Sequence, residues 1–306
     1  LLLLLLLLIS LGLGLAWLGV SSQPSLRAAA SPSPTPTPRL PSPGARPVTS
    51  TADELAQARD VLKTDPARAR ALAKAVLARD PQSAAAWGLL GDLDLVQAPA
   101  EAIKSYRRAI AIRPTDDYFA GLGFALHRSG DSAEGLKAVA KAIELDPRSA
   151  VAYRRLALIQ YERGKFERAL SAALYALQID PKSASAWNSK ALALKDLGKL
   201  PEAEEALARS LEIERDPQNL SNLAVVRAAR GNLEGALRSM SEAIELKPDS
   251  VELWVTLGTL QMNAKDHEAA IDAFDRALGL DGAHVEARFY RSLAHERAGN
   301  SKSAIT

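Results

Sequence analysis

The chain has 306 residues, of which 47% are apolar and only 5% aromatic, and it contains no cysteine. The lack of cysteine excludes disulfide bonds, thiolate catalysis and cysteine-based zinc sites. The formal net charge is +2, but residues 1–52 contain three arginines and no acid, so the remainder carries 35 bases against 36 acids. Nucleic-acid-binding proteins usually show a basic excess, so we expect no nucleic-acid partner.

Residues 1–20, LLLLLLLLISLGLGLAWLGV, are uncharged and mostly apolar. As a helix this segment would be about 30 Å long, which matches the hydrocarbon core of a bilayer. We predict a transmembrane or signal-anchor helix here. Small residues at 20–22 and 28–30 would also suit cleavage of a signal peptide, so removal of the segment stays open as the alternative.

Residues 21–50 form a linker rich in proline, serine and threonine, including SPSPTPTPRLPSPGARPVTS at 31–50. Proline at nearly every second position blocks helix and sheet, so we expect a disordered, extended spacer. Such stalks are common on the outer side of bacterial membranes, and we therefore expect the body to be periplasmic or otherwise extracytoplasmic. The three arginines of residues 1–52 favour the opposite, cytoplasmic side.

From residue 51 onward the chain repeats itself. Prolines recur every 31 to 36 residues, at positions 81, 114, 147, 181, 217 and 248. Alanine and leucine dominate the intervals, and no long β-branched run alternates with period two, so the intervals predict helices. Each proline should end one helix and begin a turn, because it lacks an N–H group.

The clearest unit, residues 251–281, contains Trp254, Leu257-Gly258, Ala270, Phe274 and Ala277. The same spacing recurs around Trp87, Phe119, Tyr153, Trp187 and Leu223. This pattern resembles the tetratricopeptide repeat (TPR). The resemblance implies an all-α, right-handed superhelix of about seven helix pairs, whose first helices line a concave groove. We place the repeats at 51–83, 84–115, 116–149, 150–183, 184–216, 217–250 and 251–284, with a partial repeat at 285–306.

Glycines and prolines mark the turns inside the repeats. Gly130, Gly164, Gly198 and Gly231 should adopt the left-handed conformation between the two helices of a pair. Pro99 and Pro201 fall in the expected first turn of a second helix. The departures from the repeat pattern include Lys190, which replaces a leucine, and Arg288, which replaces the aromatic residue.

No pattern of a catalytic, cofactor or metal site appears, so we expect a protein that is not an enzyme. The sequence GLGFAL at 121–126 follows no strand, so packing explains its glycines better than phosphate binding. The four histidines have no metal-site spacing. Asn219 begins a formal glycosylation sequon, which we interpret as a chance match, and Glu204-Glu205 are interpreted as a solvated acidic pair.

The TPR resemblance implies that the second, fifth, sixth, ninth, twelfth and thirteenth positions of each repeat face a ligand. Polar residues at the fifth, sixth and twelfth positions gather in the middle repeats. The predicted peptide-binding residues are Arg154, Arg155, Asn188, Lys195, Asn222 and Tyr161. Arginine suits a carboxylate because its planar fork can bond it twice, and the asparagine amides could pair with a peptide backbone. The simpler alternative is that these residues only keep the groove soluble.

We therefore expect a membrane-anchored scaffold that binds a protein or peptide, with no cofactor and no small-molecule substrate. The carboxylate clamp of TPR co-chaperones is not expected, because Glu252 would repel a carboxylate ligand. Two alternatives remain open. In the first, the repeats are the non-catalytic arm of a larger enzyme, such as a glycosyltransferase, that continues past Thr306. In the second, they are a structural part of an envelope assembly.

Overall fold

The computed structural model describes residues 50–62 and 64–299. In these residues every regular element is an α-helix, with no strand, as the sequence predicts. The predicted membrane segment at 1–20 and the linker up to residue 49 lie outside the described residues. Among the helices that are described, none combines the length and the apolar character needed to cross a bilayer.

Residues 50–299 form fifteen helices, most of them 13 or 14 residues long. Their bounds are α1 Thr51–Asp60, α2 Pro66–Arg79, α3 Ala84–Asp94, α4 Pro99–Ile112, α5 Asp116–Arg128, α6 Ser132–Leu145, α7 Ala150–Glu162, α8 Phe166–Ile179, α9 Ala184–Asp196, α10 Leu200–Ile213, α11 Pro217–Ala229, α12 Leu233–Leu246, α13 Val251–Asn263, α14 His267–Leu280 and α15 Val285–Arg297.

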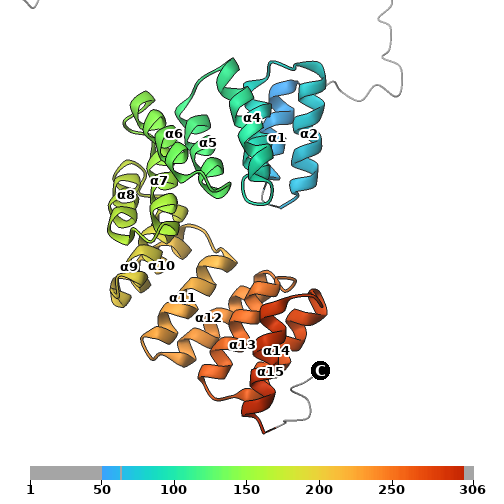
Figure 1. Cartoon of the computed structure of the whole chain (residues 1–306), viewed down its shortest axis with the longest axis vertical. Helices are drawn as coiled ribbons and strands as arrows, with labels where there is room; N and C mark the ends of the chain where they lie inside the picture. Colours follow the sequence, from blue (N-terminus) through green and yellow to red (C-terminus); the bar gives the residue numbers. More distant parts are fainter. Residues whose placement is uncertain (1–49, 63, 300–306) are drawn as a thin grey trace, which may run out of the picture. The chain divides into compact units, whose positions relative to one another are not determined.

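The helices form successive pairs that stack in chain order (Figure 1). Each odd-numbered helix packs on the even-numbered helix that follows it and also on the next odd-numbered helix. Even-numbered helices instead pack only on the odd-numbered helices before and after them. The odd-numbered helices therefore make one continuous layer, and a side chain on that layer can meet side chains from the neighbouring repeats.

Side-chain caps define where the odd-numbered helices begin. The hydroxyl groups of Ser83, Ser149 and Ser183 each accept a hydrogen bond from the backbone N–H three residues later. Thr115 caps α5 in the same way. Such caps satisfy a backbone donor that the first helical turn leaves unpaired. They explain why a serine or threonine follows each proline turn at these places.

The aromatic residue near the start of a repeat is tied to the preceding proline turn. The indole N–H groups of Trp87, Trp187 and Trp254 donate to the carbonyl oxygens of the prolines six residues earlier, at 2.8 to 3.0 Å. The side chain of Arg288, which replaces the aromatic residue, donates to the carbonyl oxygen of Gly282, also six residues earlier. The arginine thus keeps the hydrogen bond that the aromatic residue would make.

The predicted turn and packing residues behave as expected. Gly130, Gly164, Gly198 and Gly231 all have positive φ, between 69° and 100°. Pro99 is the first residue of α4, and Pro201 is the second residue of α10. Lys190, at its unusual position, places its ammonium group 4.6 Å from the centre of the Trp187 ring, which is a cation–π contact.

The glycines of the GLGFAL segment serve close packing between helices, as predicted. A Cβ atom on Gly123 would lie 2.6 Å from the carbonyl oxygen of Gly135 on α6, and one on Gly121 would lie 2.4 Å from the ring of Tyr106 on α4. Both distances are too short for a methyl group. The helix α6 and the Tyr106 side chain of α4 can approach α5 this closely only because these positions lack a side chain.

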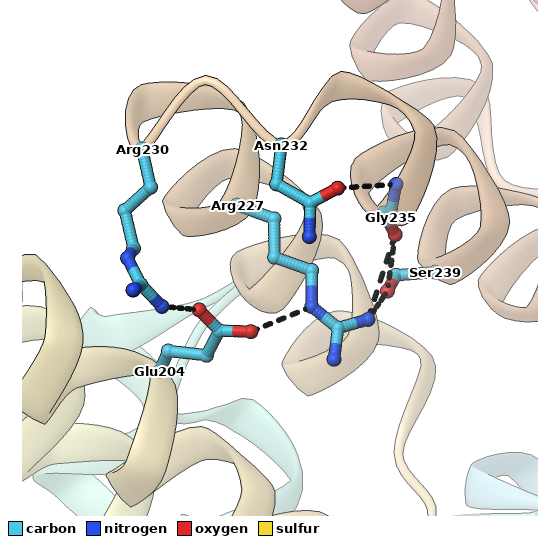
Figure 2. A network of polar contacts seen from close by, with 6 residues as sticks. All are labelled: Glu204, Arg227, Arg230, Asn232, Gly235 and Ser239. Atoms are coloured by element: carbon cyan, nitrogen blue, oxygen red, sulfur yellow. Dashed lines mark hydrogen bonds and ion pairs between the residues drawn. The ribbon is translucent and has the colours of Figure 1, made fainter.

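The acidic pair Glu204-Glu205 is not simply solvated, and this interpretation of Glu204 is wrong. The Glu204 carboxylate on α10 accepts hydrogen bonds from Arg227 and Arg230, and Arg227 also donates to the Ser239 hydroxyl on α12 at 2.7 Å (Figure 2). The partners come from the next helix pair, so the pattern of a single helix could not show them. Glu205 is exposed.

Asn219 is buried in the core rather than presented at the surface. Its amide donates to the Ser210 hydroxyl at 2.8 Å, and Ser210 in turn donates to the Ala184 carbonyl oxygen at 2.7 Å. The side chain is 6% exposed. A glycosyl group cannot be attached to this nitrogen in the folded protein.

Candidate functional site

A cavity of about 480 Å³ opens on the layer of odd-numbered helices, between α3, α5 and α7. Charged side chains make up much of its lining. Four arginines and three aspartates line it, together with two tyrosines and two glycines: Arg59, Arg113, Arg154, Arg155, Asp92, Asp116, Asp117, Tyr106, Tyr118, Gly88 and Gly121. A volume of this size suits a small ligand or a few side chains of a larger one.

Arg154 and Arg155 lie side by side on α7, and both line this cavity. Neither makes an ion pair within the described residues. The Arg155 guanidinium instead lies 5.1 Å from the centre of the Phe124 ring, and its Nε–H is buried with no hydrogen-bond partner. Burial, followed by repulsion from Arg155, lowers the pKa of Arg154 to about 10. Arg154 therefore stays charged at neutral pH without a countercharge paired to it in the described residues.

The aspartates come from the two preceding repeats. Asp92 lies near the end of α3, and Asp116 and Asp117 lie in the first turn of α5. The Tyr106 hydroxyl donates to Asp92 at 2.7 Å, and burial together with Asp92 raises the pKa of this tyrosine. Burial raises the pKa of Asp117, and the charges of Asp116 and Asp92 raise it further.

Two glycines make room for the tyrosines of the cavity wall. A Cβ atom on Gly88 would lie 2.4 Å from the Tyr118 ring, and one on Gly121 would lie 2.7 Å from the Tyr106 hydroxyl oxygen. Tyr106 is almost fully buried, with an exposed fraction of 1%. The glycines on α3 and α5 therefore make room for the two tyrosine rings that line the cavity.

The predicted asparagines lie outside this cavity and bind each other. The amide of Asn222 on α11 donates to the side-chain oxygen of Asn188 on α9 at 2.9 Å. The two residues are 34 positions apart, at the fifth position of one repeat and the sixth position of the next. Each still has an unused donor or acceptor, but the pair also ties two odd-numbered helices together.

Tyr161 and Lys195 also have a partner that the sequence did not suggest. The Tyr161 hydroxyl donates to Asp196 at 2.6 Å, and the Lys195 ammonium lies 2.9 Å from the other oxygen of that carboxylate. Burial alone would raise the pKa of Asp196, but the hydrogen bonds from Tyr161 and Lys195 lower it. Lys195 is thus already neutralised within its own helix.

The structure accordingly divides the six predicted residues into three groups. Arg154 and Arg155 share a cavity, Asn188 and Asn222 form a pair, and Tyr161 and Lys195 share Asp196. The aspartates of the cavity were missed. The signal was present, because Asp92 and Asp117 occupy the ninth and second positions of their repeats, which the TPR resemblance also turns toward a ligand.

The family model described as Tetratricopeptide repeat matches residues 55–117, 122–184, 164–219, 221–284 and 255–306, which is most of the chain. This chain belongs to the TPR family. Its helix pairs, turn glycines and continuous layer of first helices are those of a TPR solenoid, and TPR repeats are protein-interaction scaffolds.

Solved structures share this fold at low sequence identity. The human IFIT1 dimer with m7Gppp-AAAA is 17% identical over 84% of this chain and 70% of that one, with a TM-score of 0.68. The APC/C hetero-tetramer Cut9-Hcn1 is 14% identical over 80% of this chain, with a TM-score of 0.62. This TPR chain matches about half the length, 52%, of that protein.

The structure of Pseudomonas aeruginosa PilF matches a shorter part of this chain. It is 18% identical over 62% of this chain and 87% of that one, with a TM-score of 0.54. No curated protein matches this TPR chain in sequence. At these identities the structural likeness concerns the fold alone. The residues of this chain must carry any argument about its ligand.

Proposed function

We propose that this TPR protein is a non-catalytic scaffold that binds a protein or peptide partner on its layer of odd-numbered helices, with Arg154 and Arg155 at the contact. One observation carries the proposal. Two neighbouring arginines reach a cavity of about 480 Å³ and have no ion-pair partner among the described residues. Holding two unpaired guanidinium groups close together costs free energy, which a bound carboxylate would offset.

A protein ligand fits this surface better than a nucleic acid. Three aspartates share the cavity with the arginines, and residues 53–306 carry one more acid than bases. Phosphate backbones need a net basic surface, because the binding free energy comes largely from neutralised phosphates. We therefore do not expect this chain to bind a ligand such as the m7Gppp-AAAA of the IFIT1 structure.

The test is charge reversal of the arginine pair. Partners are first identified by proximity labelling of the full-length protein, and their capture is then compared between the native chain and an Arg154→Glu/Arg155→Glu variant. We expect capture to fall at least ~10-fold, since truncating or reversing a buried charge contact costs about 2–5 kcal/mol.

A matched control reverses Arg107 and Arg168, which are exposed on the even-numbered helices α4 and α8. This control should bind as the native chain does, and circular dichroism melts should show that both double variants fold. Unchanged partner capture by the folded Arg154→Glu/Arg155→Glu variant would show that the cavity is not the binding site.

We also propose that residues 1–20 hold the protein in a membrane and that residues 21–50 extend the TPR body from the outer side of the cytoplasmic membrane. The support is the composition of these segments, an uncharged apolar run of bilayer length followed by a proline-rich spacer. We expect the full chain to sediment with membranes and residues 51–306 to stay in the supernatant. In intact spheroplasts, added protease should digest the TPR body, and protection from the protease would place it on the cytoplasmic side.

A further inference from the structure

The cavity around Arg154 displays charges of both signs without pairing them. Arg154 and Arg155 enter from α7, while Asp92 enters from α3 and Asp117 from α5. No ion pair joins these arginines to these aspartates in the part of the chain that the structure describes. Arg154 and Arg155 are half-buried, and half-buried charges usually pair within the protein, so two arginines that stay unpaired beside aspartates require an explanation.

Like charges repel one another within the arginine pair and within the group of aspartates. Burial and then the charge of Arg155 disfavour the ionised form of Arg154, which shows in its lowered pKa of about 10. Burial and then the charges of Asp116 and Asp92 disfavour the ionised form of Asp117, and raise its pKa. The arginines lower the pKa of Asp117 again, but not back to its ordinary value. A ligand that brings the opposite charge to both groups would relieve both.

A ligand of one sign would fit this cavity poorly. An anion would satisfy Arg154 and Arg155, but it would also approach Asp92, Asp116 and Asp117. A cation would satisfy the aspartates, but it would also approach Arg154 and Arg155. Because the cavity is only about 480 Å³, the two parts of a suitable ligand must lie on neighbouring side chains rather than on distant segments.

The arginine side of the cavity is also held in place before a ligand arrives. The Arg155 guanidinium lies against the Phe124 ring, and its buried Nε–H has no acceptor in the protein. On the acidic side, the Tyr106 hydroxyl fixes one oxygen of Asp92. Asp117 makes no hydrogen bond through its carboxylate within the described residues and is exposed, so it is free to meet a cation.

We infer that the cavity binds a peptide segment in which a glutamate or aspartate is adjacent to a lysine or arginine. Arg154 and Arg155 pair with the carboxylate of the ligand, and Asp117, assisted by Asp92, pairs with its basic side chain. This inference rests on the proposed function, and it specifies the chemistry of the partner: a segment of mixed charge, rather than a purely acidic one.

The experiment uses four fluorescein-labelled peptides with blocked ends and Gly-Ser flanks, whose central residues are Lys-Glu-Lys, Gln-Glu-Gln, Lys-Gln-Lys or Gln-Gln-Gln. Fluorescence anisotropy measures their Kd for the full chain at low salt. We expect the Lys-Glu-Lys peptide to bind at least ~5-fold more tightly than either the Gln-Glu-Gln or the Lys-Gln-Lys peptide, as one charge-assisted contact would give.

Two variants assign the preferences to residues. Arg154→Gln/Arg155→Gln should abolish the preference for Glu over Gln and keep the preference for Lys. Asp117→Asn should abolish the preference for Lys and keep the preference for Glu over Gln. Two controls, Arg107→Gln/Arg168→Gln and Asp272→Asn, change exposed residues on α4, α8 and α14. Both should keep the two preferences.

Two results would overturn the inference. One is equal binding of the Gln-Glu-Gln and Lys-Glu-Lys peptides, since the aspartates would then not contact the ligand. The other is no binding of any of the four peptides at ~1 mM. The first result leaves the proposed function intact, because an acidic partner would still need Arg154 and Arg155. The proposed function fails separately, when capture of the partner is insensitive to reversal of the arginine pair.

Discussion

Gly121 shows how a single missing side chain shapes the candidate site. It lies on α5 at the edge of the cavity, and the Tyr106 ring from α4 fills the space that a Cβ atom would take. The position of that ring in turn brings the Tyr106 hydroxyl to Asp92. The glycine therefore sets the place of one of the charges that the cavity presents.

Substitution Gly121→Ala should destabilise the protein. The new methyl group would lie 2.4 Å from the Tyr106 ring, which is almost fully buried and is held by the hydrogen bond from its hydroxyl to Asp92. Overpacking of this kind costs about 1–3 kcal/mol. Urea unfolding followed by circular dichroism should show a lower midpoint with an unchanged slope.

Gly279→Ala is the matched control, because no atom lies within 4 Å of the Cβ that it would add on α14. This variant should be neutral or more stable by up to ~1 kcal/mol, since alanine is the better helix former. If Gly121→Ala were equally harmless, the close packing of Tyr106 on α5 would be contradicted.

Between elements, polar networks add to the apolar contacts that hold successive repeats together. Glu204 on α10 binds Arg227 and Arg230, and Arg227 continues to Ser239 on α12 (Figure 2). The Asn232 side chain caps α12 by accepting from the Gly235 N–H at 2.9 Å. One carboxylate thus joins the second helix of one repeat to both helices of the next.

Glu204→Gln should weaken this connection in a pH-dependent way. Burial would raise the pKa of Glu204, but the hydrogen bonds from the two arginines lower it below its ordinary value. A group with a lowered folded-state pKa contributes stability above its unfolded pKa of about 4.3, and this contribution is lost as the pH falls through the folded value. At pH 7 we expect a loss of roughly 1–2 kcal/mol, because hydrogen bonds to charged groups contribute most.

Urea titrations at pH 7 and at pH 3 provide the measurement. The difference between native and Glu204→Gln proteins should shrink at the lower pH, where the native carboxylate takes up its proton. Glu245→Gln changes an exposed glutamate on α12 and should alter stability by less than ~0.5 kcal/mol at either pH. An equal loss at both pH values would show that the Glu204 charge is not responsible.

At the scale of the whole molecule, each helix pair depends on its neighbours. A repeat in a solenoid contacts only the repeats beside it, so local stability follows the apolar surface that each helix buries. Helix α1 has only 10 residues and buries Leu55 and Ala58. Helix α5 buries a continuous run, 120–126, between the helix pairs on either side.

Amide hydrogen exchange should reveal this difference. We expect protection factors in α1 to be at least ~10-fold lower than in α5, which corresponds to about 1.4 kcal/mol in opening free energy. Exchange of the native full-length protein, followed by mass spectrometry of peptic fragments, measures both helices in one sample. Equal protection would mean that the array opens only as a single cooperative unit.

The sequence by itself determined the repeat, the helical class and the turns. Prolines at 31- to 36-residue intervals, capping residues such as Ser83 and Ser149, and the turn glycines all act within a few residues of themselves. Local signals of this kind can be read from the chain, because backbone conformation and hydrogen bonding near a residue depend mainly on its neighbours.

Only the tertiary structure decided which side chains meet. Asn188 binds Asn222, Glu204 binds Arg227, and Asp117 shares a cavity with Arg154, although each pair comes from different repeats. Repeat positions predicted the face on which Arg154 and Arg155 lie, but not the partners that surround them. Those partners are set by how closely successive helix pairs stack, and that spacing depends on side-chain packing between repeats rather than on any local pattern.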